Sequence, residues 1–133
     1  MYIAITGHTR GIGKALFDRH KLEHPFKGYS KSTGYDITQD AGKIVLQAAS
    51  CDVFINNAHS GWAQVDVLPR IYRTWRPFSD RTIVNISSVV KYPGLSSGST
   101  EYSAQKSALS HQAFLLMFRD PERRCRIINI NPG

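Results

Sequence analysis

Tyr102 and Lys106 form the pair best suited to catalysis in this chain. They stand four positions apart in a stretch with helical character, so their side chains lie on one face of the helix, one turn apart. A lysine ammonium beside a phenol favours the phenolate, which suits the phenol to proton transfer near neutral pH. The pair alone is a weak signal, because a half-buried tyrosine beside a solvated lysine also fits an ordinary helix.

Ser88 is the third candidate for catalysis. It follows the predicted strand 82–86. Its hydroxyl can donate a hydrogen bond to a substrate carbonyl while the tyrosine supplies a proton. Ser87 is its neighbour, and the alternation of side chains along a strand puts the two serines on opposite faces. For either serine taken alone, a structural position at a strand end is the alternative.

A glycine-rich loop follows the first predicted strand, 2–6, and opens a helix. Gly7 suits a tight turn off the strand, Gly11 leaves the backbone open to a phosphate, and Gly13 allows the helix to pack closely on the sheet. Free N–H groups and the helix dipole then favour a pyrophosphate. The candidate cofactor-binding residues of this loop are Gly7, Thr9, Arg10, Gly11, Ile12 and Gly13.

Five segments in this order resemble the short-chain dehydrogenase/reductase family. They are the glycine loop, Asn-Asn-Ala-His at 56–59, Asn-Ile-Ser-Ser at 85–88, the Tyr-x-x-x-Lys pair, and Pro-Gly at 132–133. The resemblance implies carbonyl reduction or alcohol oxidation on a small substrate with a nicotinamide cofactor. In such a reaction Tyr102 would exchange the proton. Lys106 would support the phenolate and hold the ribose. Ser88, which precedes Tyr102 by 14 positions and so lies close to the family's usual interval, would orient the carbonyl.

The resemblance also implies cofactor contacts outside the glycine loop. Asp36 and Ile37 are similar to the family's adenine-contacting pair, and Asn57 and Ala58 to the segment beside the ribose. The cofactor-binding residues expected beyond the loop are Ser30, Lys31, Asp36, Ile37, Asn57, Ala58, Ile86, Tyr102, Lys106, Pro132 and Gly133.

The end of the second predicted strand favours NADP(H) over NAD(H). NAD-binding folds usually place an acid there, which accepts from the ribose 2′-hydroxyl. This chain instead has Ser30 and Lys31, and Arg10 lies in the glycine loop. Cations and a hydroxyl suit a 2′-phosphate. Asp36 is the rival, because it lies 23 residues after Gly13 and would favour NAD if it bound the ribose.

Three departures from the family pattern bear on activity. His59 stands where a glycine is usual, and we interpret it as a loop histidine rather than a catalytic base. The family's helix-borne catalytic asparagine has no match between Asn57 and Asn85, which leaves Gln64 as an open substitute. Family members continue past the final Pro-Gly with a substrate lid and a last strand, so the resemblance is to an abbreviated member.

Alternating strand and helix patterns predict an α/β fold, a doubly wound parallel sheet of the Rossmann type in a single domain, 1–133. The expected strand order is 3-2-1-4-5-6, with the third strand vestigial or absent. Strands are expected at 2–6, 26–30, 52–56, 82–86 and 126–130. Helices are expected at 11–20, at 39–49 after an N-cap at Thr38, and from a cap at Ser99 or Thr100 to 118. Pro69 suits a first helical turn, which favours a two-turn helix before residue 76.

The composition is that of an ordinary globular protein, with 41% hydrophobic and 20% charged residues. The first strand begins at the start of the chain, which leaves no room for a signal peptide, and no apolar run is long enough to span a membrane. Cys51 and Cys125 are expected to be reduced thiols of a cytoplasmic protein, with neither a disulfide nor a metal site.

The net charge of +7 leaves three functional classes open. Residues 1–66 hold seven basic and six acidic residues, whereas residues 67–133 hold ten and four. The first class is an oxidoreductase. The second is a non-catalytic NADP-binding module, which the missing lid and the missing catalytic asparagine favour. A nucleic-acid-binding protein is less favoured, because arginines at 70, 73 and 76 on one helix are more often a solvated face. The resemblance also implies that the protein forms a homo-oligomer, a dimer or tetramer, in which subunits pair through the helix that carries Tyr102.

Overall fold

The computed structural model describes residues 1–89 and 99–133. In these residues strands and helices alternate along the chain. The strands are β1 (Ile3–Thr6), β2 (Phe26–Tyr29), β3 (Val53–Asn56), β4 (Thr82–Ile86) and β5 (Arg126–Ile130). The helices are α1 (Gly11–His20), α2 (Ala41–Ala48), α3 (Ala63–Trp75) and α4 (Thr100–Arg119), and a short 3₁₀ turn, η1 (Lys31–Thr33), follows β2.

The strands form one parallel sheet in the order β2-β1-β3-β4-β5. The predicted α/β fold is therefore confirmed, and the strand order is the predicted one once its third strand is left out. The chain passes from β1 outward to β2 and then returns to the other side of β1 with β3. The winding reverses between β1 and β3, and sheets of this kind bind ligands beyond the carboxyl ends of the strands at that point.

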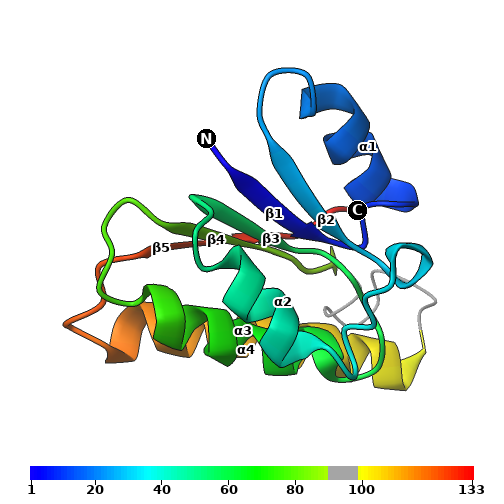
Figure 1. Cartoon of the computed structure of the whole chain (residues 1–133). Coiled ribbons are helices and arrows are strands. Elements are labelled where there is room, and N and C mark those ends of the chain that lie inside the picture. The colour runs from blue at the N-terminus through cyan, green and yellow to red at the C-terminus, as the bar shows by residue number, and fades with distance from the viewer. Residues whose placement is uncertain (90–98) are drawn as a thin grey trace.

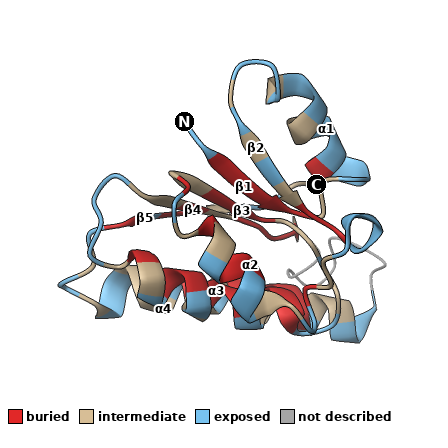
Figure 2. Cartoon of the chain, viewed as in Figure 1, coloured by how far each residue is buried: buried red, intermediate tan, exposed pale blue. Residues whose placement is uncertain are grey.

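The helices cover the two faces of the sheet unequally. Helix α1 lies over β1 and β2 on one face, whereas α2, α3 and α4 lie together on the other (Figure 1). The larger core is on the side of the three helices and includes the fully buried Phe54, Trp75, Ile83 and Leu109. Figure 2 shows the buried residues of these helices on the sides that face the sheet. The strands are thus buried there by apolar packing, which is the main stabilising term of such a layer.

The face beneath α1 holds a smaller core of Ile3, Ile5, Ile55 and Ile86. It thins toward β5, where Ile128 is 40% and Ile130 44% exposed. Parallel strands are normally buried on both faces. Within residues 1–89 and 99–133, the β5 end of this sheet therefore presents apolar side chains to solvent.

Helix α4 begins at the cap that its sequence predicts. The Ser99 hydroxyl accepts a hydrogen bond of 3.2 Å from the backbone N–H of Tyr102, and Ser99 has the extended backbone of an N-cap residue. Glu101 adds a negative charge to the first turn, where the helix dipole favours it. The prediction of a cap at Ser99 or Thr100 is resolved in favour of Ser99. The cap fixes the turn on which Tyr102 is carried.

The predicted N-cap at Thr38 is wrong. Helix α2 begins at Ala41 with Asp40 at the N-cap position, and Thr38 lies in the turn before it. Both the backbone N–H and the hydroxyl of Thr38 donate to Asp36 Oδ1, at 2.9 and 2.7 Å. An aspartate that binds its own chain two residues on makes an Asx-turn, so this threonine closes a turn and does not start a helix.

The predicted two-turn helix around Pro69 is also wrong. Helix α3 has 13 residues and begins six residues before the proline. An internal proline removes one backbone hydrogen bond. The helix continues because its apolar face is held by the core, with Leu68, Ile71 and Trp75 fully buried.

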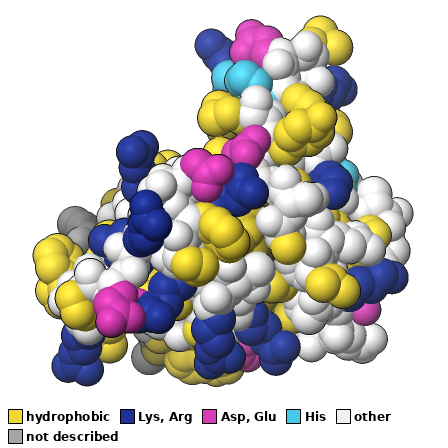
Figure 3. Space-filling model, turned by 60° about the vertical axis from the view of Figure 1, so that its left-hand side comes forward, with side chains coloured by type: hydrophobic (Ala, Val, Ile, Leu, Met, Phe, Trp, Pro, Cys, Tyr) yellow, Lys and Arg dark blue, Asp and Glu magenta, His cyan; other side chains and the backbone are white. Residues whose placement is uncertain are grey.

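The arginines of α3 do not form one uniform face. Arg76 pairs with Asp120 at the end of α4, to which the Tyr72 hydroxyl also donates, and its guanidinium lies 3.1 Å from Glu122. Arg73 is exposed. On the face shown in Figure 3, lysine and arginine side chains lie in several groups with neutral and hydrophobic surface between them. At least one of the three arginines therefore joins α3 to α4.

Two further sequence expectations concern the environment of the protein. Cys51 and Cys125 are free and buried, and burial raises the pKa of both thiols. Over residues 1–89 and 99–133, no helix combines the length and the hydropathy that crossing a membrane requires.

Candidate active site

A cavity of about 720 Å³ lies beside the glycine loop, the turn after β2 and the loop after β3. It is bounded on a further side by α4. Thirteen of the predicted cofactor-binding residues line it: Gly7, Thr9, Arg10, Gly11, Ile12, Ser30, Lys31, Ile37, Asn57, Ala58, Ile86, Tyr102 and Lys106. The topology thus brings together segments that lie up to 99 positions apart in the sequence.

Some of the predicted site residues do not line this cavity, and some residues that line it were not predicted. Outside its lining are Gly13, Asp36, Ser88, Pro132 and Gly133. Lining residues that sequence reasoning did not assign to the cofactor are Ser32, Tyr35, His59, Ser60 and Ser87. Ser32 and Tyr35 lie within four residues of Lys31 in the sequence, and this closeness was the available signal.

Positions 11 and 13 of the loop are glycine for different physical reasons. Gly11 has a φ of 57°, and a Cβ there would meet nothing within 4 Å, so the backbone is open to the cavity. A Cβ on Gly13 would stand 2.1 Å from the carbonyl oxygen of Gly7 and 2.5 Å from Nδ2 of Asn57. Residue 13 is therefore glycine because helix α1 packs against the loop, while Gly11 leaves room for a ligand.

Asn57 and Thr6 hold the glycine loop in place. Nδ2 of Asn57 donates to the carbonyl oxygens of Thr6 and Gly7, at 3.0 and 3.1 Å. The Thr6 hydroxyl accepts from the backbone N–H groups of Asn57 and Ala58, at 3.0 and 2.9 Å. These bonds tie the end of β1 to the end of β3. Sequence reasoning missed Thr6, although a buried hydroxyl at a strand end directly before a glycine was the signal.

The turn after β2 carries the residues predicted to select the cofactor. The Ser30 hydroxyl accepts a hydrogen bond of 2.9 Å from the His8 backbone and lies 3.0 Å from His8 Nδ1. Lys31 lies 3.6 Å from the Asp36 carboxylate, and its side chain is well exposed. Hydrogen bonds from Thr38, together with Lys31, lower the pKa of Asp36. The Asp36 carboxylate is thus engaged within the turn, and Lys31 and Arg10 line the cavity together with a third basic residue, Lys106.

Tyr102 and Lys106 lie together on α4, and the lysine is almost fully buried. Its ammonium nitrogen is 5.6 Å from the centroid of the Tyr102 ring. It donates to Oε1 of Gln64 at 2.7 Å and to the carbonyl oxygen of Ile86 at 3.0 Å. The residue is 3% exposed, and burial lowers the pKa of Lys106 to about 8. This lysine can therefore change its charge close to physiological pH.

The two serines after β4 have different surroundings. The Ser87 hydroxyl donates to the backbone carbonyl of Lys106 at 3.2 Å and lies 2.8 Å from the Ser110 hydroxyl. It joins β4 to α4. Ser88 follows in the sequence and is buried, and the next backbone N–H, that of Val89, donates to the carbonyl of Pro132 at 3.3 Å. Ser87 thus has a structural role, and the role predicted for Ser88 stays a prediction.

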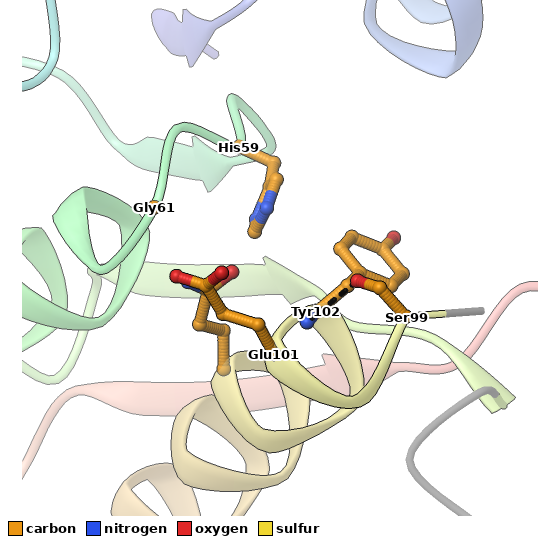
Figure 4. A pocket seen from close by; sticks show the side chains of 6 residues that line it. His59, Gly61, Ser99, Glu101 and Tyr102 are labelled. Carbon is orange, nitrogen blue, oxygen red and sulfur yellow. Dashed lines mark hydrogen bonds between the residues drawn. The ribbon is translucent and has the colours of Figure 1, made fainter.

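A second cavity of about 460 Å³ adjoins the first at Tyr102 and His59. Gly61, Ser99, Glu101 and Gln105 complete its lining, and Figure 4 shows the side chains of His59, Glu101 and Tyr102 converging on it. Burial, and to a lesser extent Lys106, lowers the pKa of His59. His59 is therefore an exposed histidine at the junction of both cavities, and its surroundings favour the neutral imidazole.

The sequence itself has no match among protein-family models or curated proteins. Solved structures do match. A short-chain dehydrogenase from Burkholderia cenocepacia, in complex with NADP, has a TM-score of 0.80 and 19% identity, over 99% of this chain and 71% of that chain. A short-chain dehydrogenase from Streptomyces avermitilis has a TM-score of 0.79 and 20% identity, over 99% of this chain and 65% of that one.

L-sorbose reductase from Gluconobacter frateurii, complexed with NADPH and L-sorbose, has a TM-score of 0.74 and 19% identity, over 99% of this chain and 68% of that one. The chain thus has the fold of short-chain dehydrogenase/reductase structures and spans about two thirds of their length. The resemblance stated from the sequence motifs is confirmed at the level of the fold.

Proposed function

We propose that this protein is an abbreviated short-chain dehydrogenase/reductase that binds NADP(H) and reduces a carbonyl or oxidises an alcohol. One observation carries the proposal: the glycine loop and the Tyr102–Lys106 pair line the same cavity. Either motif alone could arise by chance. Their meeting across three strands, in a fold with this switch point, supports a dinucleotide site next to a proton-transfer group.

The cavity residues fit a dinucleotide phosphate. The open backbone at Gly11 and the start of α1 suit a pyrophosphate, which helix N-termini bind. Arg10 of the glycine loop and Lys31 after β2 border the same cavity and suit a 2′-phosphate. Two of the compared structures, from Burkholderia cenocepacia and Gluconobacter frateurii, contain NADP and NADPH. These observations together support NADP(H) over NAD(H).

A nicotinamide bound here would supply hydride chemistry, which side chains do not provide. The remaining steps fall to residues of this chain. In carbonyl reduction the Tyr102 hydroxyl donates the proton to the carbonyl oxygen, and in alcohol oxidation the phenolate accepts it. Ser88 donates a hydrogen bond to the same oxygen and orients it.

Lys106 has two roles in this proposal. Its ammonium lies 5.6 Å from the centroid of the Tyr102 ring, and its positive charge stabilises the phenolate. Two of its three N–H groups meet Gln64 and Ile86, and the remaining one serves a ribose hydroxyl of the cofactor. Substrate binds in the adjoining 460 Å³ cavity, because Tyr102 lines both spaces.

A paired measurement tests the proposal: fluorescence titration with NADPH, and turnover of a panel of small ketones. We expect NADPH to bind, and Tyr102→Phe to lose about 10²–10⁴ in kcat, because phenylalanine keeps the ring and removes only the transferable proton. NADPH affinity should survive that change. Binding without any turnover would instead indicate a non-catalytic NADP-binding module, and wild-type kcat in Tyr102→Phe would contradict the role of the phenol.

A further inference from the structure

Gln64, Lys106 and Ile86 form a closed triangle of hydrogen bonds beneath the active site. Nε2 of Gln64 donates to the Ile86 carbonyl oxygen at 2.9 Å, and the Lys106 ammonium donates to the same oxygen at 3.0 Å. The third side is the 2.7 Å bond from the ammonium to Oε1 of Gln64. The ammonium is therefore held by two acceptors, the Gln64 amide oxygen and the Ile86 carbonyl oxygen. The Gln64 amide nitrogen also donates to that carbonyl.

The orientation of the Gln64 amide is fixed by its other contacts. Its Nε2 also donates to the Asn56 carbonyl oxygen at 2.7 Å, so both amide hydrogens face carbonyl groups. A flipped amide would set its oxygen against those two carbonyls. The side chain is 1% exposed, and the first turn of α3 carries it. Oε1 must therefore face the ammonium.

A buried cation usually has a carboxylate partner. Within residues 1–89 and 99–133, Lys106 takes part in none of the ion pairs. A neutral amide holds the ammonium in place but leaves its positive charge uncompensated. That charge then acts on Tyr102, whose ring it faces. A glutamate at position 64 would neutralise it.

We propose that Gln64 is the positioning residue of Lys106: its amide oxygen fixes the ammonium at the point from which it serves the cofactor ribose and Tyr102. This deepens the proposed function and rests on it. It also fills the place that the missing asparagine leaves open in the sequence. The competing view is that Gln64 merely ties β3 to β4 through the carbonyls of Asn56 and Ile86.

The first experiment measures the titration of Lys106 by NMR of isotope-labelled lysine side chains, assigned with Lys106→Met. Three surroundings face the ammonium. They are the Tyr102 ring on α4, His59 from the loop after β3, and the neutral Gln64 and Ile86 groups. Gln64→Met keeps the length of the side chain and removes the acceptor. We expect the pKa of Lys106 to fall below its wild-type value, because the charged form loses a hydrogen bond.

Two further variants frame that result. Gln64→Asn keeps the amide but shortens its reach by one methylene, and we expect it to lower the Lys106 pKa as Gln64→Met does. Gln64→Asn also provides the test of the proposal if the Gln64→Met protein does not fold. Gln105→Met is the matched control, because Gln105 is a buried glutamine of the same helix as Lys106 whose side-chain amide donates to Glu101. A Lys106 titration that is the same in all four proteins would overturn the proposal.

The second experiment is a double-mutant cycle on NADPH affinity. Gln64→Met should raise the Kd of NADPH about tenfold, the value of one hydrogen bond to a charged group. In the Lys106→Met background the same change should have no further effect, because the glutamine acts through the lysine. Additive losses would show that Gln64 acts as a strand tie and would overturn the proposal. If wild type binds no NADPH, the proposed function fails, while the NMR titration still decides the Gln64–Lys106 relationship.

Discussion

The imidazole of His59 meets the ring of Tyr102 edge to face, with the ring centroids 4.8 Å apart and the ring planes at 82°. His59 comes from the loop after β3 and Tyr102 from the first turn of α4, and both line the two adjoining cavities (Figure 4). Aromatic pairs prefer this geometry and gain about 0.5–1.5 kcal/mol from it beyond burial. The contact therefore restrains the phenol at the boundary between the two cavities.

We expect His59→Ala to lower kcat about two- to tenfold, because the loss of an aromatic contact of that strength frees the phenol ring. His59→Phe is the matched variant, since it keeps an aromatic edge and removes the titratable nitrogens. Steady-state turnover at saturating NADPH should be close to wild type in His59→Phe. Equal losses in both variants would instead assign a proton-carrying role to the imidazole, against our prediction that it is not a catalytic base.

The structure shows why part of this site could be predicted from sequence. Local patterns were sufficient for the apolar run of β1, for the glycines that follow it, and for the four-residue spacing of Tyr102 and Lys106. The cap at Ser99 is also local. Such features depend on a few neighbouring residues, so they can be recognised before the fold is known.

Other features required the tertiary structure. The contact between Gln64 and Lys106 spans 42 positions, and no local pattern identifies the helix face that carries the glutamine toward β4. Pro69 suggested a helix start, but burial of the α3 face outweighed the one lost hydrogen bond. Asp36 lies at the spacing of a ribose-binding acid, but its carboxylate accepts two hydrogen bonds from Thr38 and so closes a turn. Packing thus overrode the local signal at Pro69, and the contacts of Gln64 and Asp36 became visible only in the folded chain.

We expect the cofactor preference to depend on two cations, Arg10 in the glycine loop and Lys31 after β2. We expect NADPH to bind more tightly than NADH, and Arg10→Ala with Lys31→Ala to weaken NADPH at least tenfold while NADH changes little. The ion pair of Lys31 with Asp36 is exposed and therefore weak, so the lysine can turn to a 2′-phosphate.

Fluorescence titration of both cofactors checks that preference. Lys14→Ala is the control, because it removes an exposed lysine of α1 that pairs with Asp18 outside the cavity lining. Asp36→Asn should leave the preference unchanged. Equal affinities for the two cofactors in wild type, or an unaltered NADPH affinity in the double variant, would refute the assignment.

The buried Lys106 makes stability depend on pH in a known direction. Its pKa is about 8 in the folded protein and 10.5 in an ordinary lysine. Between these values the unfolded chain binds a proton that the folded chain has released, so the free energy of unfolding rises with pH. Below pH 8 both states are protonated, and the folded state carries the full cost of burying the charge.

We therefore expect the wild-type protein to gain about 1–3 kcal/mol between pH 8 and pH 10 relative to Lys106→Met. Urea unfolding of both proteins at several pH values measures the difference, and subtraction removes the contribution of groups that the two share. Parallel stability curves would mean that the lysine titrates at its ordinary value and that its burial costs nothing.

Self-association should occur through the outward face of α4. His111, Phe114 and Phe118 lie there, with the two phenylalanine centroids 4.6 Å apart and the imidazole stacked on Phe114. Phe118 is 71% exposed. Because the three residues recur at intervals of three and four, they form one aromatic stripe along the helix. A two-fold axis through this stripe would bury the same residues of both copies.

We expect the wild-type protein to be a dimer or a larger homo-oligomer at micromolar concentration, and Phe118→Asp to be a monomer. An aspartate there would set like charges against one another and remove the apolar area that association buries. Leu22→Asp is the matched control, since Leu22 is 93% exposed, lies just past α1 and takes no part in the stripe. Light scattering over a concentration series measures the mass of each protein. A wild-type monomer throughout, or a Phe118→Asp protein that associates as strongly as Leu22→Asp, would rule out the α4 face as the interface and direct attention to the exposed isoleucines of β5.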